Sequence, residues 1–191
     1  YMTGREFEEK TFQPSGLSDE PLLEVRNLAL PGSYEDISFS LRGGEILGVT
    51  GLLDSGRTEL ALSLFGIRPA QSGEIRIHGK PTVIKSPRAA IENGIGFVPE
   101  DRLGMGLVGS MGMTGNMMLR GYNEGRGIFA NRKEPKELAE KIVDQLQVST
   151  PSVNTPVSRL SGGNVQKVLV GREISADPTV LMVAYPVRGL D

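Results

Sequence analysis

A glycine-rich loop at residues 51–58 places the strongest constraint on what this chain can fold into. The loop reads Gly-Leu-Leu-Asp-Ser-Gly-Arg-Thr and fits the pattern G-x-x-x-x-G-K-[ST], except that Arg57 stands where lysine is usual. A nearly continuous apolar run at residues 45–50 precedes the loop, and residues 58–65 read as a short leucine-rich helix. A buried strand, a glycine-rich loop and a helix in this order predict a phosphate-binding unit within a parallel α/β core.

The residue types of the loop suit a polyphosphate. In this geometry backbone N–H groups and the helix N-terminus surround the phosphates, and the hydroxyl of Thr58 ligates Mg²⁺. The planar guanidinium of Arg57 is larger than a lysine ammonium, so it would contact phosphate with an altered geometry. The carboxylate of Asp54 repels a polyphosphate unless it points away. For this motif alone, an ordinary glycine-rich strand-to-helix turn is the alternative.

A second candidate anion site lies at residues 160–164, which read Leu-Ser-Gly-Gly-Asn and precede a helix predicted over residues 163–175. The Ser161 hydroxyl and the amides of Gly162 and Gly163 would meet at the N-terminus of that helix, where anions bind favourably. By itself this string could be only a helix cap with a tight turn. A chain rarely needs two such sites for one phosphate.

Composition removes several other classes of protein. The chain has 191 residues, 38% hydrophobic and 23% charged, which is the balance of one soluble globular domain. A net charge of −2 provides no bulk basic field for nucleic acid or anionic lipid. The absence of cysteine excludes disulfides, thiolate metal sites and thiol nucleophiles. No apolar run approaches the 18 or so residues that a membrane span needs, and residues 1–10 are too charged for a secretory signal.

Hydrophobic periodicity predicts the remaining elements. We expect strands where apolar residues alternate or cluster, at residues 22–28, 37–41, 74–78, 95–99 and 180–184. We expect helices after the Ser86-Pro87 cap and over residues 134–148. Residues 102–127 are rich in glycine and methionine and indicate a flexible, adaptable surface rather than the core of a sheet. The pattern predicts a parallel α/β core with an antiparallel start and a mainly helical insertion at about residues 102–160.

Taken together, the two glycine-rich strings and their spacing resemble the nucleotide-binding domain of ABC transporters over residues 22–191. The match is closer still to the second of two fused ATP-binding domains in ribose, galactose and xylose importers of bacteria. The strings that carry it are Gly-Arg-Thr-Glu-Leu at 56–60, Phe-Val-Pro-Glu-Asp-Arg at 97–102, the signature at 160–164 and Arg-Gly-Leu-Asp at 188–191. Residues 2–5 resemble the end of the first domain, which makes residues 1–21 an expected interdomain linker. The string at 188–191 resembles the D-loop of the family, so this chain is expected to stop just after that loop.

The resemblance implies a P-loop NTPase fold of ABC type, with an antiparallel β subdomain and a helical subdomain, and with ATP and Mg²⁺ as cofactors. Two such domains close head to tail, so each ATP lies between the P-loop of one and the signature of the other. The implied residues of this domain's own site are Gly51, Asp54, Ser55, Gly56, Arg57, Thr58 and Glu59, with Thr58 on the metal. Glu100 replaces the glutamine that senses γ-phosphate, and Ser161, Gly162 and Gly163 would reach the partner domain's nucleotide.

The chain departs from the family pattern where catalysis needs it most. The family places Asp-Glu-Pro after the last buried strand, whereas this chain has Ala184-Tyr185-Pro186. Neither Ala184 nor Tyr185 can act as a carboxylate base at neutral pH, so no catalytic residue is assigned and little or no hydrolysis is expected from this chain alone. We therefore expect a degenerate site of its own and a signature that completes the ATP site of a sister domain.

Two aromatic or basic residues invite roles that we do not assign. His78 occurs too early in the chain to be the histidine that contacts γ-phosphate in the family, and it is expected on the surface of a strand. Tyr34 is the one aromatic residue near the position that stacks on adenine, and a turn residue is the simpler interpretation.

The resemblance also implies partners. The expected partners are the permease subunits of a transporter and, indirectly, a periplasmic or extracellular sugar-binding protein. Nucleic acid is not expected as a partner. The domain is expected on the cytoplasmic face of the membrane. Residues 103–118 would receive a coupling helix of the permease, a disordered loop being the alternative. A P-loop-like scaffold that binds no nucleotide also remains open. A DNA-repair ATPase would need heptads that are missing here, and a GTPase or kinase leaves the second glycine-rich site unexplained.

Overall fold

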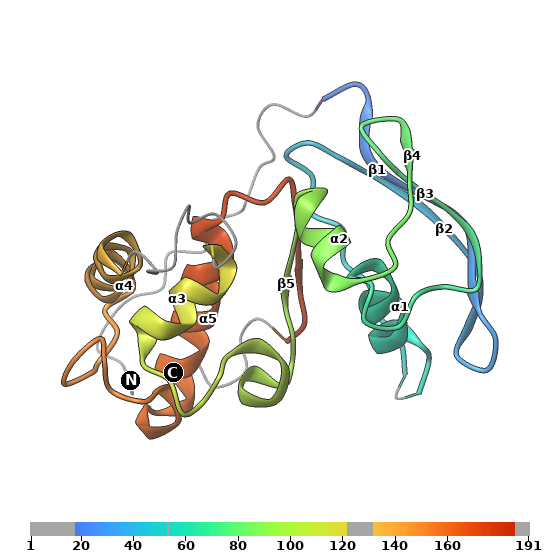
Figure 1. The fold of residues 1–191 in the computed structure, drawn as a ribbon. Helices are drawn as coiled ribbons and strands as arrows, with labels where there is room; N and C mark the ends of the chain where they lie inside the picture. Colours follow the sequence, from blue (N-terminus) through green and yellow to red (C-terminus); the bar gives the residue numbers. More distant parts are fainter. Residues whose placement is uncertain (1–17, 53, 122–131, 186–191) are drawn as a thin grey trace, which may run out of the picture. The chain divides into compact units, whose positions relative to one another are not determined.

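The computed structural model describes residues 18–52, 54–121 and 132–185. These residues form two compact units, one ending at Lys85 and the other beginning at Ser86 (Figure 1). Of the linker expected over residues 1–21, residues 1–17 lie outside the described residues, as does the family string at 188–191, and Pro21 already belongs to the first strand. None of the helices in these ranges is both long enough and apolar enough to cross a bilayer.

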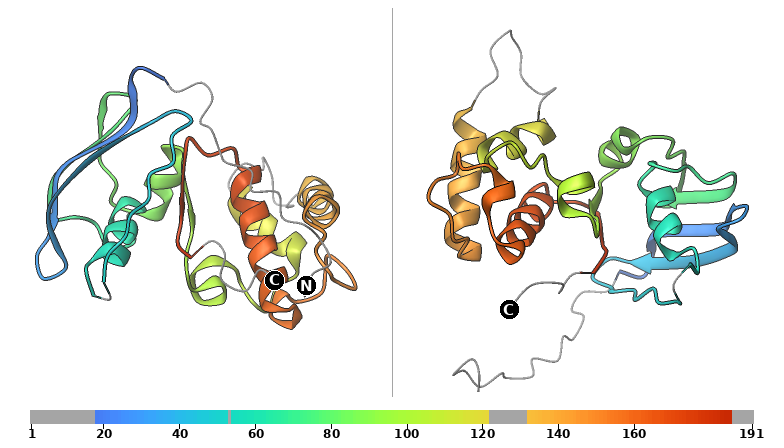
Figure 2. Two further views of the ribbon diagram at one scale, coloured as in Figure 1. Left: turned by 180° about the vertical axis from the view of Figure 1, so that it is seen from behind. Right: turned by 90° about the horizontal axis from the view of Figure 1, so that it is seen from below.

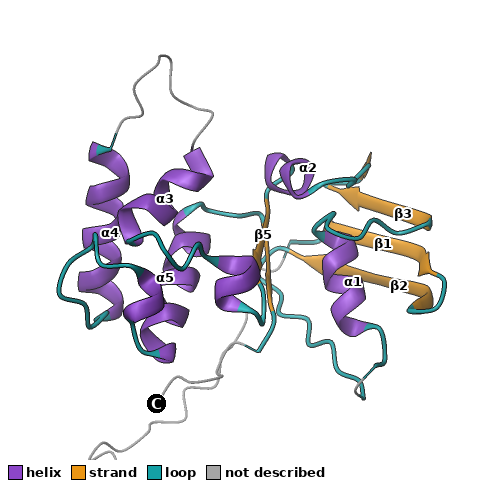
Figure 3. Cartoon of the chain, turned by 60° about the horizontal axis from the view of Figure 1, so that its bottom comes forward, coloured by secondary structure: helices purple, strands orange, loops and turns teal. Residues whose placement is uncertain are grey.

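The first unit is built on an antiparallel sheet, as the alternating patterns predicted. Its strands are β1 (Pro21–Leu30), β2 (Tyr34–Arg42), β3 (Ser72–Ile77) and β4 (Lys80–Thr82), in the order β2-β1-β3-β4 (Figure 3). Leu23 and Val25 are buried, and an irregularity in the pairing after Val25 brings Leu28 to a buried position as well. Gly73 of β3 lies against that irregularity, because a Cβ at Gly73 would be 2.5 Å from the Cα of Leu28.

Helix α1 (Arg57–Leu64) follows the glycine-rich loop and buries Leu60, Ser63 and Leu64. It begins one residue earlier than the sequence predicted. Gly56 is the N-cap of this helix, and the last two residues of the loop, Arg57 and Thr58, belong to its first turn. This arrangement brings backbone N–H groups without partners inside the helix to the end of the loop.

The apolar run at residues 45–50 is not the buried strand that its sequence predicted. It has no regular secondary structure, and the side chains of Ile46 and Val49 are 73% and 55% exposed. An apolar sequence favours the interior of a sheet, but a strand forms only where neighbouring strands satisfy its N–H and C=O groups. No strand among the described residues pairs with this run, which accounts for the difference.

The second unit holds a short parallel sheet and a helical cluster. Strands β5 (Ile95–Val98) and β6 (Val180–Val183) pair in parallel, with Ile95 opposite Val180 and Val98 opposite Val183. Helix α2 (Pro87–Glu92) precedes β5 and has the predicted cap, since the Ser86 side chain accepts a hydrogen bond from the Ala89 amide at 3.2 Å. The predicted parallel core is thus present here as two strands, of which β6 is less buried than expected.

Helices α3 (Met113–Gly121), α4 (Lys133–Leu146) and α5 (Gly162–Ser175) lie side by side in the second unit (Figure 2). A π-helical turn, η1 (Arg102–Gly106), packs against α5, and a 3₁₀ turn, η2 (Val157–Arg159), leads into it. The amphipathic helix predicted at residues 134–148 is confirmed as α4. Its face of Leu138, Ile142, Val143 and Leu146 belongs to the core.

The expectation of a flexible surface at residues 102–127 is wrong for its central part. Met113 and Met117 lie on one face of α3, four residues apart, and are almost completely buried. They join the core cluster, whose buried members are Val98, Leu107, Met113, Met117, Ala139, Ile142, Val148, Val157, Val165, Val168 and Leu169. Unbranched methionine adapts to irregular interiors as well as to adaptable surfaces, so composition alone does not separate the two.

Asn116 fastens the segment before α3 to that helix. Its Oδ1 accepts a hydrogen bond from the Val108 amide at 2.8 Å, while its Nδ2 donates to the carbonyls of Val108 and Gly112 at 3.2 and 3.1 Å. The side chain is completely buried. It satisfies backbone groups that would otherwise be buried without partners.

We expect Asn116→Ala to lower the free energy of unfolding by about 2–4 kcal/mol, because it leaves buried backbone groups unpaired and opens a cavity. Urea denaturation of the chain measures this change. Asn93→Ala is the control, since the exposed Asn93 amide donates only to the Ala89 carbonyl within α2, and its cost should stay near 0.5 kcal/mol. Equal losses from the two variants would contradict the role of Asn116.

Candidate nucleotide-binding site

The two glycines of the loop at residues 51–58 lie close to other atoms of the chain, and the backbone requires glycine at position 56. Gly56 has φ +82°, and a Cβ there would lie 2.2 Å from the carbonyl oxygen of Ser33. A Cβ at Gly51 would lie 2.4 Å from the Oγ of Ser55. At both positions the obstructing atoms belong to the chain itself, to the backbone of Ser33 for Gly56 and to the side chain of Ser55 for Gly51.

Arg57 lies across its own loop. Its Nη1 donates a hydrogen bond to the Gly51 carbonyl at 3.2 Å, which joins the two ends of the loop. Thr58 follows on the first turn of α1 and is exposed, and Glu59 is half-buried on the same turn. The Thr58 hydroxyl is therefore open to a ligand at the helix N-terminus, which favours anions.

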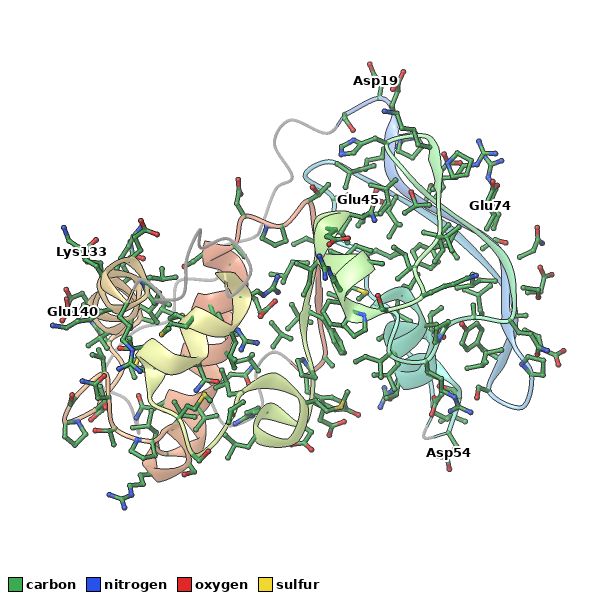
Figure 4. The ribbon with its side chains drawn as sticks, in the orientation of Figure 1. Asp19, Glu45, Asp54, Glu74, Lys133 and Glu140 are labelled. Carbon is green, nitrogen blue, oxygen red and sulfur yellow. The ribbon has the colours of Figure 1, made fainter. Side chains whose placement is uncertain are left out.

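A tight turn closes the middle of the loop. The Ser55 amide donates to the Leu52 carbonyl at 3.2 Å, so a phosphate could use that amide only after the turn opens. Asp54 has φ +62° and is exposed, and Figure 4 shows its side chain pointing outward from the loop. That orientation removes the repulsion expected between its carboxylate and a polyphosphate.

Tyr34 and His78 lie close to their predicted positions. Tyr34 is the first residue of β2 rather than a turn residue, and its ring is only 7% exposed. Burial raises the pKa of the Tyr34 hydroxyl above its ordinary value, and a ring buried in this way offers no face to adenine. His78 is on the surface, as expected, but in the turn that follows β3, with φ +50°.

The second glycine-rich string forms a capped helix N-terminus, as predicted. Ser161 is the N-cap of α5, and its Oγ accepts hydrogen bonds from the amide and the Nδ2 of Asn164, at 3.5 and 2.9 Å. The Oδ1 of Asn164 accepts in turn from the Ser149 amide at 2.9 Å. Ser161 and Gly162 are exposed. The string therefore presents a hydroxyl and the first N–H groups of a helix from a backbone fixed by side-chain contacts.

Sequence reasoning missed the arginine that contacts this string. Nη1 of Arg102, in η1, donates to the Gly162 carbonyl at 2.8 Å. Sixty residues separate the two in the sequence, and no periodic pattern links them. The motif 97–102 drew attention to Arg102 only as part of a resemblance.

Sequence reasoning also missed a cluster of buried ionic groups near the C-terminal end of α5. Glu173 of α5 is 1% exposed and accepts hydrogen bonds from Arg120 of α3 and, at 2.9 Å, from Nε of Arg172. The Phe97 amide of β5 donates to the same carboxylate at 3.4 Å. Burial lowers the pKa of the Arg172 guanidinium to about 10. A single carboxylate thus connects a strand with two helices.

The ends of β5 and β6 meet at one edge of the small sheet. The Ala184 amide donates to the Val98 carbonyl at 2.9 Å and continues the parallel pairing past the last residue of β6. Tyr185 is exposed with φ +52°, and Glu100, also exposed, follows the end of β5. Because carboxyl ends of parallel strands share an edge, Glu100 and Ala184 leave the sheet on the same side. Pro186 lies outside the described residues.

Comparison with known proteins identifies the family. Residues 34–186 match the family described as ABC transporter. The chain is 42% identical over 195 residues to the galactofuranose transporter ATP-binding protein YtfR of Escherichia coli K12 and 41% identical over 193 residues to the ribose import ATP-binding protein RbsA 1 of Rubrobacter xylanophilus. Both matches cover the whole chain, which spans only 39% and 38% of the length of these relatives.

Solved structures agree on the fold. The dimeric ATP-binding cassette MJ0796, bound to ADP and phosphate, superimposes with a TM-score of 0.71 at 18% identity, over 88% of this chain and 76% of that one. The predicted fold, a P-loop NTPase core of ABC type, is confirmed by such neighbours. With its capped signature helix and its glycine-rich loop at the start of α1, this chain belongs to the ABC transporter family of ATP-binding domains.

Proposed function

We propose that this chain is the second of two fused ATP-binding domains in a bacterial sugar importer, and that its main chemical contribution is to the ATP site of its sister domain. The observation that carries the proposal is a contrast between the signature and the segment after β6. The signature is capped by Ser161 and fixed through Asn164, whereas β6 is followed by Ala184 and Tyr185 in place of carboxylates. The names of the sugar-import relatives support the transported class.

The nucleotide site of this domain would use the loop at residues 51–58. Gly51, Ser55, Gly56 and Arg57 would hold the phosphates of ATP, and Thr58 would ligate Mg²⁺. The exposed Thr58 hydroxyl and the first turn of α1 suit these roles. Bound Mg²⁺ would offset charge on the phosphates. Arg57 would have to exchange its contact with the Gly51 carbonyl for a phosphate oxygen.

Hydrolysis at this domain's own site should be slow or absent. Phosphoryl transfer to water depends on a residue that orients the attacking water, and carboxylates usually supply it. Ala184 has no polar side-chain atom, and the phenol of Tyr185 is not a carboxylate that could accept a proton from water at neutral pH. The hydroxyl of Ser161 and the amides of Gly162 and Gly163, by contrast, would complete the sister domain's site at its γ-phosphate.

The domain would sit within a longer polypeptide and a membrane complex. Residues 1–21 would link it to the sister domain, residues 22–191 would form the ATP-binding domain, and residues 102–160 its helical subdomain. Permease subunits would contact residues 103–118, where Leu103, Met105 and Met111 are exposed and follow Glu100 closely in the sequence. In such a complex the domain would lie on the cytoplasmic face of the membrane, with a sugar-binding protein as an indirect partner.

An equilibrium titration of this chain with ATP, with and without Mg²⁺, tests the nucleotide site. We expect Arg57→Ala to weaken binding by roughly tenfold or more, the loss typical of a charge-assisted hydrogen bond. Arg68→Ala, which removes an exposed arginine after α1, should leave the affinity unchanged. If the folded chain bound no ATP, the alternative of a scaffold that binds no nucleotide would replace this part of the proposal.

A further inference from the structure

The π-helical turn η1 is fastened to α5 at both of its ends. At its first residue, Arg102 donates from Nη1 to the Gly162 carbonyl at 2.8 Å, at the start of α5. At its last residue, the Gly106 carbonyl accepts from Nη2 of Arg172 at 2.7 Å, near the end of α5. A Cβ at Gly106 would lie 2.7 Å from Leu169, so the turn packs closely on the helix between these two contacts.

The contact made by Arg102 adds a restraint to one peptide group of the signature, at the first residue of α5. The Gly162 carbonyl and the Gly163 amide belong to the same planar trans peptide and point in opposite directions. A guanidinium that holds the carbonyl therefore also fixes the direction of the Gly163 N–H. That N–H is one of the first donors of α5, which have no partner within the helix.

The charge of Arg102 also favours an anion at the start of α5. A cation at a helix N-terminus is unfavourable, because it adds to the positive end of the helix dipole. An anion bound at Ser161, Gly162 and Gly163 would be attracted by this charge as well as by the helix N-terminus. A cation on the carbonyl side of the peptide also polarises it and makes its N–H a better donor.

We infer that Arg102 is a positioning residue for the signature, which orients the Gly163 amide toward the terminal phosphate of a nucleoside triphosphate held by the sister domain. This inference rests on the proposed function of the signature. Because η1 begins two residues after Glu100, the contact also joins the end of β5 to the start of α5 through one side chain. Arg102 acts through the backbone of Gly162 and Gly163, not by touching the phosphate.

Steady-state ATP hydrolysis by the assembled transporter tests the inference. We expect Arg102→Gln to lower kcat roughly tenfold while the KM for ATP changes less than about twofold, because the oriented amide matters most in the closed, reacting state. Arg102→Lys should recover part of kcat, since it keeps a cation but lacks the planar fork of donors. Arg159→Gln, which changes an exposed arginine two residues before Ser161, should leave both constants unchanged.

Two further measurements separate positioning from folding. In this chain, Arg102→Gln should shift the NMR signal of the Gly163 amide while the thermal midpoint stays within a few degrees of the wild-type value. Loss of stability together with loss of activity, with no recovery by lysine, would overturn the inference in favour of a structural role. An unmoved Gly163 signal would overturn it as well.

Ser161→Arg in the same transporter preparation distinguishes this inference from the proposed function. If Ser161→Arg abolishes hydrolysis and Arg102→Gln matches Arg159→Gln, the signature works without Arg102 and only the inference is wrong. If hydrolysis survives Ser161→Arg, the proposed role of the signature is wrong, and the positioning role that depends on it falls too.

Discussion

Ser161→Arg should lower ATP hydrolysis by the assembled transporter by about a hundredfold or more, since loss of one preorganised donor at a developing charge already costs that much. Ser161 is exposed and its hydroxyl caps α5, at the helix N-terminus where the proposed anion would bind. An arginine side chain would fill that region and keep the sister domain's nucleotide away. Loss of the cap itself should cost only about 1 kcal/mol of stability, so the variant should still fold.

Two comparisons make this result specific. Ser175→Arg introduces the same side chain at the exposed other end of α5, where a cation suits the helix dipole, and hydrolysis should be unaffected. Arg57→Ala, in this domain's own loop, should reduce hydrolysis much less than Ser161→Arg. Equal losses from Arg57→Ala and Ser161→Arg would show that both sites contribute alike, contrary to the proposed asymmetry.

Glu173→Ala should lower the free energy of unfolding by about 3–5 kcal/mol, the usual cost of removing one partner from a buried ionic group. The substitution would leave the guanidinium groups of Arg120 and Arg172 without their shared carboxylate. It would also remove the hydrogen bond that the Phe97 amide donates to this carboxylate. Urea denaturation of the chain, followed by circular dichroism, measures the loss.

Glu140→Ala is the matched control for this prediction. Glu140 lies on the exposed face of α4, paired with Lys136 at 3.6 Å (Figure 4), and such surface pairs contribute about 0–1 kcal/mol. Glu173→Gln should fall between the two alanine variants, because the amide oxygen still accepts hydrogen bonds while the charge is lost. A cost for Glu173→Ala no larger than that for Glu140→Ala would mean that water or other groups compensate the arginines.

The elements that the sequence predicted well are those whose signals are local. Ser86 before Pro87 and Ser161 before two glycines begin helices as expected, because a cap uses only a side chain and an amide three residues away. The apolar run at residues 45–50 failed for the opposite reason. Its character as a strand depends on partners elsewhere in the chain, and residue types describe only the preference of the segment itself.

The same distinction between local signals and long-range contacts holds for the candidate site. Both glycine-rich strings were found from spacing, since each is a continuous turn into a helix. The Arg102 contact with Gly162 and the Glu173 cluster join residues that are tens of positions apart. The residues next to these arginines and glutamates in the sequence do not indicate which groups they contact. The contacts can be identified only in the folded structure.

Because Gly56 lies so close to the Ser33 carbonyl, a glycine at this position of a phosphate-loop pattern is not by itself evidence of nucleotide binding. Any side chain at position 56 would collide with the turn between β1 and β2 whether or not a nucleotide ever arrives. A domain of this kind that had stopped binding ATP would still be held to glycine there by its own architecture. Glycine at position 56 therefore reports a demand of folding, and nucleotide binding has to be judged from residues that the fold does not constrain in this way, such as the exposed Thr58.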